Sequence, residues 1–158
     1  MRQYILHLSL LETKIWRRIS ISGKMSFSDL HNVIQILFGW ENEHLHKFVA
    51  GQLEIGDYAE EDSLPINYSY EGDLSLEVIL DNDTEFIYEY DFGDGWRILI
   101  KVEERKDTSE FFGVKVLNAV GEMAQENCGG VLGLNVRDDV ELDVGVLNEL
   151  LAKVKAGK

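Results

Sequence analysis

The chain of 158 residues is poor in cysteine and proline, with one of each, Cys128 and Pro65. A single thiol cannot form an internal disulfide, which excludes the disulfide-stabilised folds of small secreted proteins. No apolar run approaches the ~20 residues of a membrane-spanning helix. The apolar N-terminus, MRQYILHLSLL, is interrupted by His7 and Ser9, and no small-residue cleavage site follows it. We therefore expect a cytoplasmic protein with no membrane partner.

Positive charge is also scarce, because 15 basic residues face 29 acidic ones, for a net charge of -14. A field of that sign repels phosphate backbones and argues against nucleic acid as a partner. Lys14, Arg17 and Arg18 form the one basic cluster, and we expect Arg17 and Arg18 to be solvated. With six arginines in the chain, the residue sets of serine and tyrosine recombinases are missing.

The chain has no repeat, low-complexity tract or linker, so residues 1–158 are predicted to form one compact domain. Alternating apolar residues predict strands over 3–11, 15–22, 45–55 and 113–120. Residues 75–80 fit either a short helix or a strand. The acidic segment 56–73, which contains the proline, is expected to be a surface excursion.

Two helices are predicted from apolar periodicity and capping residues. Ser26 and Asp29 have capping-box spacing before the first helix, and Gly39 is a suitable stop. The second helix begins at about Val144 with Asp143 as its cap. Strands and helices do not alternate regularly, which favours an α+β domain with a mainly antiparallel sheet and its helices on one side.

The stretch 88-YEYDFGDGWRILIKVEE-104 is predicted to be a β-hairpin. A three-residue loop, Gly93 to Gly95, would set Phe92 opposite Trp96 and Asp91 opposite Arg97 and keep the apolar residues on one face. The Asp-Phe-Gly triplet also occurs in protein kinases, but the glycine-rich loop, strand lysine and catalytic aspartate of a kinase are missing. The triplet is therefore interpreted as a turn.

Several motifs in order carry a resemblance to a known family: 16-WRR-18, 29-DLHNVIQILFGWENEHLHKF-48, 90-YDFGDGW-96, 126-ENCGG-130 and Gly133. Together they resemble the plasmid pRiA4b ORF-3-like family, found on plasmids and mobile elements, over nearly the whole chain. The resemblance implies a compact α+β fold without implying an activity. Some members are labelled resolvases, a label that does not fit the composition of this chain.

The chain departs from the family pattern at two positions. The family commonly has a histidine where this chain has Ile98, and a cysteine where it has Met123. If relatives hold a metal or a reactive centre with that histidine and cysteine, this protein has replaced both with apolar residues. We expect packing at these positions.

His44 and His46 are the candidate metal ligands, because alternate residues of a strand project from one face. Cys128, Glu126, Asp91 and Asp94 would complete such a site. The competing interpretation is that the histidines cap backbone groups or pack against aromatic rings. Cys128 as a nucleophile would need a histidine base and an electropositive setting, whereas Glu122 and Glu126 lie near it in sequence.

The resulting hypothesis is a binding or interaction module without catalysis of its own and with no expected cofactor. Its partner would be an unidentified protein or small molecule. Trp96 would serve as an aromatic wall, and the histidines and carboxylates would make polar contacts. The alternatives are a metal-dependent, perhaps hydrolytic, enzyme that holds zinc or another divalent ion at His44 and His46, and an accessory factor of a mobile element. The predicted working surface consists of His44, His46, Asp91, Asp94, Trp96, Glu126 and Cys128.

Overall fold

The structure is a computed structural model that describes residues 2–57, 67–108 and 113–156. Pro65 and half of the predicted surface excursion, residues 58–66, lie outside these ranges. None of the helices within them is long and apolar enough to span a membrane.

Eight strands form a single sheet in the order β5-β4-β3-β6-β7-β1-β2-β8. Of the neighbouring pairs, β4 and β5 are parallel and the others antiparallel. The predicted α+β class with a mainly antiparallel sheet is confirmed. The strands are β1 (Arg2–Leu10), β2 (Trp16–Ser22), β3 (His46–Ala50), β4 (Leu53–Gly56), β5 (Tyr68–Tyr70), β6 (Glu85–Tyr90), β7 (Trp96–Asp107) and β8 (Val114–Val120).

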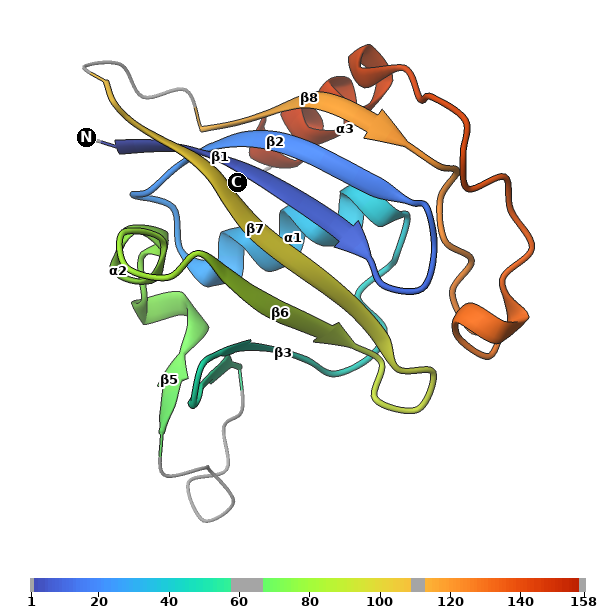
Figure 1. Cartoon of the computed structure of the whole chain (residues 1–158), viewed down its shortest axis with the longest axis horizontal. Helices are drawn as coiled ribbons and strands as arrows, with labels where there is room; N and C mark the ends of the chain where they lie inside the picture. The colour runs from blue at the N-terminus through green and yellow to red at the C-terminus, as the bar shows by residue number, and fades with distance from the viewer. Residues whose placement is uncertain (1, 58–66, 109–112, 157–158) are drawn as a thin grey trace.

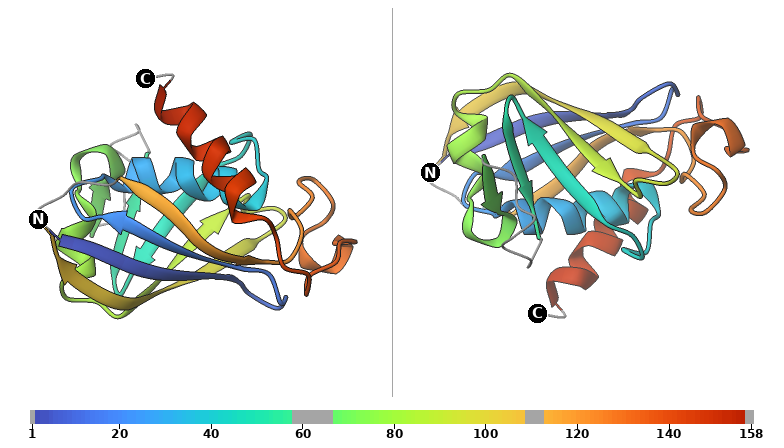
Figure 2. Two further views of the ribbon diagram at one scale, coloured as in Figure 1. Left: turned by 90° about the horizontal axis from the view of Figure 1, so that it is seen from above. Right: turned by 90° about the horizontal axis from the view of Figure 1, so that it is seen from below.

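The sheet curves around helix α1, which lies along its concave side (Figures 1 and 2). Helix α3 packs against β8 and α1 on the same side (Figure 2). The helices are α1 (Phe27–Phe38), α2 (Leu76–Leu80) and α3 (Val144–Ala156), with short 3-10 turns η2 (Glu71–Asp73) and η3 (Val131–Gly133). The core is therefore enclosed between α1 and the concave face of the sheet.

The two ends of α1 are capped by the residues that the sequence pattern predicts. The Ser26 hydroxyl accepts a bond from the Asp29 amide at 3.0 Å, and the Asp29 carboxylate accepts one from the Ser26 amide at 3.0 Å. Gly39 ends the helix in the left-handed conformation, at φ 80°. The cap of α3 is also as predicted, since the Asp143 carboxylate accepts a bond from the Gly145 amide at 2.8 Å.

Two segments differ from the simplest sequence interpretation. The predicted strand 45–55 is a hairpin of β3 and β4 that turns at Gly51, whose φ is 60°. The ambiguous segment 75–80 is helix α2, preceded by Ser75.

The predicted register of the β6–β7 hairpin is wrong by two residues. Tyr90 pairs with Trp96 and Glu89 with Arg97, so the loop is Asp91 to Gly95 and Phe92 is 45% exposed. The Asp91 side chain causes the difference, because its Oδ1 accepts bonds from the Gly93 and Asp94 amides and closes the turn. A shift of two residues keeps each side chain on its face, so face matching cannot distinguish the two registers.

The prediction that Arg17 is solvated is wrong, because its guanidinium is fully buried. It donates to the carbonyls of Leu37 at 2.8 Å, Val120 at 2.7 Å, Gly121 at 3.0 Å and Trp16 at 3.0 Å. Burial lowers the pKa of Arg17 to about 10, so it keeps its charge at neutral pH. A cation at the C-terminus of α1 also suits the helix dipole.

Arg18 provides a matched control for Arg17, since it is exposed and pairs with Glu103 at 2.6 Å. We expect Arg17→Met to lower the free energy of unfolding by at least about 3 kcal/mol, because several buried carbonyls lose a charged donor. Arg18→Met should cost about 0–1 kcal/mol, as surface ion pairs do. Denaturant unfolding of both variants measures the difference, and equal losses would contradict the structural role given to Arg17.

Candidate functional site

Three segments that are distant in sequence meet at one end of the sheet, on the right of Figure 1. They are the loop from α1 to β3, the β6–β7 turn and the chain that follows β8. The Ala124 amide donates to the Phe38 carbonyl at 3.0 Å and the Asp91 amide to the Leu45 carbonyl at 2.9 Å. These backbone bonds hold the three segments side by side.

His44 lies at the centre of this junction and faces oxygens from the other two segments. Its Nε2 is 2.7 Å from Asn127 Oδ1, 3.5 Å from Asp91 Oδ2 and 3.9 Å from Glu126 Oε1. The two carboxylate side chains are only 11% and 10% exposed, whereas that of His44 is 31% exposed. A third carboxylate, that of Glu43, places an oxygen within 4.8 Å of ligand atoms of His44 and Glu126. We call Glu43, His44, Asp91, Glu126 and Asn127 the His44 cluster.

The Glu126 carboxylate is held from both sides. The Tyr90 hydroxyl donates to Oε1, and the Glu41 amide donates to Oε2 at 2.8 Å. Burial, together with the bond to Glu126, raises the pKa of Tyr90 above its ordinary value. The phenol therefore stays protonated and keeps donating to the carboxylate at neutral pH.

Asp91 and Asn127 both adopt the left-handed backbone conformation, at φ 57° and 61°. Among non-glycine residues, Asp and Asn adopt this conformation most readily, because their short polar side chains can hydrogen-bond locally. Asp91 Oδ1 is engaged by its own turn, which leaves Oδ2 directed at His44. At Gly130, an added Cβ would lie 2.3 Å from the Asp94 carbonyl oxygen. The backbone after Cys128 therefore closely approaches the backbone of the β6–β7 turn.

The other predicted site residues lie around this junction in different settings. The Asp94 carboxylate accepts a bond from the Gly129 amide at 3.3 Å. The Cys128 thiol is half-buried, and within the described chain its hydrogen-bond partner is the Gly130 carbonyl at 3.4 Å. Trp96, the predicted aromatic wall, has a fully buried ring whose centroid lies 5.5 Å from that of Trp40.

The expectation that His44 and His46 project from one strand face is wrong. His44 precedes β3, and His46 is its first residue. The His46 ring is buried, with Nε2 2.6 Å from Glu71 Oε1, and it belongs to a separate group with Asp57 and Glu71. The two histidines therefore serve different parts of the molecule and cannot ligate one ion together.

His46 adjoins a buried polar network that the sequence pattern did not predict. The ring of His31 stacks on that of His46 with 3.4 Å between centroids. His31 Nε2 is 2.8 Å from Asn42 Oδ1 and its Nδ1 is 2.8 Å from the Tyr88 hydroxyl. Because Asn42 Oδ1 can only accept, Nε2 donates and Nδ1 accepts from Tyr88.

Gln35 completes the network. Its Nε2 donates to the Tyr88 hydroxyl at 2.9 Å and its Oε1 accepts from the Asn42 amide at 2.7 Å. The one sequence signal for this network is that His31 and Gln35 are four residues apart on the helix face that also buries Leu30 and Ile34.

Comparisons with known proteins give similar sequences and one similar solved structure. A sequence model of the family described as plasmid pRiA4b ORF-3-like protein matches residues 2–139. The uncharacterized protein y4hQ of Sinorhizobium fredii is 34% identical over 130 residues, which cover 78% of this chain and 63% of that protein. The chain thus spans less than two thirds of that relative. A crystal structure of a protein of unknown function from Methanosarcina mazei has a TM-score of 0.70 at 28% identity, covering 84% of this chain and 77% of that one.

The buried network makes stability depend on pH through His31. Burial, and then the neighbouring His46, lower the pKa of His31 to about 4, against an ordinary value of 6.5. Protonation of the unfolded chain therefore removes stability as the pH falls from 6.5 toward 4, and the contribution is complete above pH 6.5. We expect the difference in unfolding free energy between wild type and His31→Gln to shrink by about 2 kcal/mol from pH 7 to pH 5. Denaturant unfolding at both pH values tests this, and a constant difference would refute it.

Proposed function

The chain belongs to the plasmid pRiA4b ORF-3-like family, a family of unknown function, and we propose that it is a non-catalytic binding module that holds a divalent metal ion at the His44 cluster. One observation carries the proposal. Two nearly buried carboxylates, from Asp91 and Glu126, face His44 Nε2 at 3.5 and 3.9 Å.

Charge balance at the cluster favours a bound cation. An imidazole N–H on Nε2 can donate one linear hydrogen bond, and Asn127 is the nearest acceptor, at 2.7 Å. Neither the Asp91 nor the Glu126 carboxylate therefore accepts the hydrogen bond of the His44 imidazole. Partly buried negative charges are stabilised by a compensating positive charge, which a metal ion beside them would supply.

The spacing of the donor atoms suits an ion. Ligand atoms ~2.0–2.2 Å from one metal are separated by roughly 3–4 Å. Ligand atoms of Glu43, His44 and Glu126 all lie within 4.8 Å of one another, and the His44–Glu126 distance of 3.9 Å falls in that range. Asp91 is outside this group of three and faces His44 Nε2 at 3.5 Å. Asn127 is closer, but it is exposed and on a loop, so it can move back when the ion binds. One imidazole with several carboxylate oxygens is a donor set for Zn²⁺ or Mn²⁺.

The buried pair His46–Glu71 is the weaker candidate. Its nitrogen and oxygen are 2.6 Å apart, in direct hydrogen-bond contact, and both side chains are almost completely enclosed. An ion between them would have to push apart two groups that are packed into the core.

Binding is favoured over catalysis by the state of the polar groups. Both Glu126 oxygens accept hydrogen bonds, which fixes the carboxylate in position, and each oxygen keeps a lone pair for an ion. Ile98 is fully buried in the hydrophobic core, and Met123 is partly buried against the same core. The partly exposed His44 edge leaves a coordination position that a carboxylate or another donor of a partner would occupy.

Titration calorimetry with Zn²⁺ and with Mn²⁺ tests this proposal. We expect one equivalent of at least one of these ions to bind wild-type protein, and His44→Ala to weaken binding by at least about tenfold because it removes the nitrogen ligand. His7→Ala is the matched control, since His7 stacks on Trp16 and is absent from the His44 cluster. It should bind the ion as wild type does.

Two further variants locate the ion. Glu126→Gln should also weaken binding, whereas His46→Gln should not. The absence of stoichiometric binding to wild type would overturn the proposal. So would binding that survives His44→Ala and is lost in His46→Gln, because the ion would then belong to the buried pair.

A further inference from the structure

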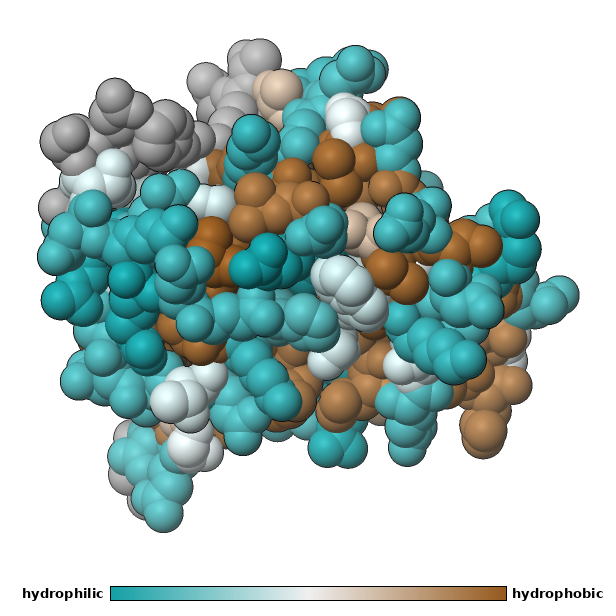
Figure 3. Space-filling model, turned by 45° about the horizontal axis from the view of Figure 1, so that its top comes forward, coloured by the Kyte–Doolittle hydropathy of each residue, from teal (hydrophilic) through white to brown (hydrophobic). Residues whose placement is uncertain are grey.

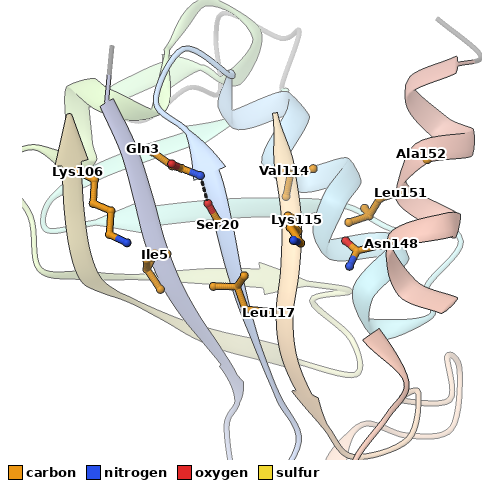
Figure 4. A pocket seen from close by; sticks show the side chains of 10 residues that line it. All are labelled: Gln3, Ile5, Ser20, Lys106, Val114, Lys115, Leu117, Asn148, Leu151 and Ala152. Atoms are coloured by element: carbon orange, nitrogen blue, oxygen red, sulfur yellow. Dashed lines mark hydrogen bonds between the residues drawn. The ribbon is translucent and has the colours of Figure 1, made fainter. Parts of the chain in front are cut away.

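A second site lies at the other end of the strands, where β1, β2, β7 and β8 border a pocket of about 640 Å³ that extends to α3 (Figure 4). Its volume is in the range of small-molecule sites, roughly 300–1,000 Å³. Lys106 is ten residues from Trp96 along β7, roughly 33 Å of extended strand. The pocket is therefore separate from the His44 cluster. It is lined by Gln3, Ile5, Ser20, Lys106, Val114, Lys115, Leu117, Asn148, Leu151 and Ala152.

The walls of the pocket are mainly apolar and are fixed in place. Ile5, Val114 and Leu151 are each less than a tenth exposed. Leu117 has no cross-strand partner in the irregular stretch of the β2–β8 ladder, where Arg18 pairs with Asn118 and Ile19 with Val116. In Figure 3, which brings the top of Figure 1 forward, apolar surface is visible between hydrophilic borders.

α3 forms one wall because a side-chain amide attaches it to the edge strand. The Asn148 amide accepts a bond from the Val116 N–H at 2.8 Å and donates to the Val116 carbonyl at 3.1 Å. These bonds imitate a neighbouring strand and cover the free edge of β8 at that point. The position of Leu151 beside β8 follows from this attachment (Figure 4).

Two donor side chains of the pocket, Ser20 and Lys115, lie on one row of the sheet. Ile5 pairs with Ser20, and Ser20 pairs with Lys115, so the three lie side by side. Gln3 Nε2 donates to the Ser20 hydroxyl (Figure 4), which leaves the hydroxyl proton free to donate to a ligand. Lys115 is exposed and has no ion pair with any described residue.

The charge of the lining is opposite to that of the protein. Both charged residues that line the pocket are lysines, in a chain whose net charge is -14. Lys106 has a partner in Glu104, at 3.6 Å, so Lys115 is the cation available to a ligand. One free ammonium group beside one hydroxyl donor suits a singly charged acid group.

We propose that this pocket binds a small monocarboxylic acid with an apolar body. The carboxylate is held by Lys115 and the Ser20 hydroxyl, and the apolar body lies against Ile5, Leu117 and Leu151. This site does not depend on metal binding at the His44 cluster.

Calorimetric titration with decanoate tests the proposal, with decanol as an uncharged ligand of the same chain length. We expect decanoate to bind with a Kd of about 0.1 mM and decanol at least about tenfold more weakly. Lys115→Met should weaken decanoate binding about tenfold. Lys101→Met is the matched control, because Lys101 is an exposed lysine of β7 that does not line the pocket, and it should leave binding unchanged.

A second variant tests the cavity itself. Ala152 lines the pocket from an exposed position of α3, so Ala152→Phe fills space without disturbing the core and should reduce decanoate binding. Circular dichroism and melting temperature check that each variant is folded. No saturable binding of decanoate, equal binding of decanol, or unchanged binding in both folded Lys115→Met and Ala152→Phe would overturn the proposal.

Discussion

The rest of the structure depends on the hydrogen bonds that the buried guanidinium of Arg17 donates to backbone carbonyls. It has no carboxylate partner among the described residues, and its donors instead bind carbonyls at the end of α1, in β2 and at the end of β8. It also lies 5.1 Å from the centre of the Phe38 ring. A charge without a counter-ion is stable in the core only when its donors are satisfied, so Arg17 fixes the positions of all these carbonyls together.

The His44 cluster is a consequence of that arrangement. The loop that leaves α1 after Phe38 carries His44, and the segment that follows Gly121 carries Glu126 and Asn127. Arg17 joins both segments at their origin, and the Glu41 amide joins them again at Glu126. The site is therefore positioned by the core, although its residues lie on loops, which is how a rigid scaffold usually presents functional groups.

The two proposed sites use opposite charges at opposite ends of the same strands. Carboxylates gather where the turns are held by Asp91, Glu126 and left-handed backbone, whereas two lysines and several apolar residues line the pocket at the other end. Charged ligands of opposite sign would thus be drawn to different ends of the molecule.

The sequence by itself determined the local structure: the capping box of Ser26, the stop at Gly39, the cap of α3, the alternation of β1 and the α+β class. These features depend on residues close together in the chain, where side-chain chemistry and periodicity act directly. The hairpin register is decided by the local turn that Asp91 closes, which matching the faces of the strands does not reveal. Tertiary structure alone decided the burial of Arg17 and the separation of His44 from His46. Registers that differ by two residues place the side chains on the same faces of the sheet. An arginine in a strand is predicted to be solvated unless its distant carbonyl partners are known. Which residues meet His44 likewise depends on how three remote segments pack, and local patterns do not encode that packing.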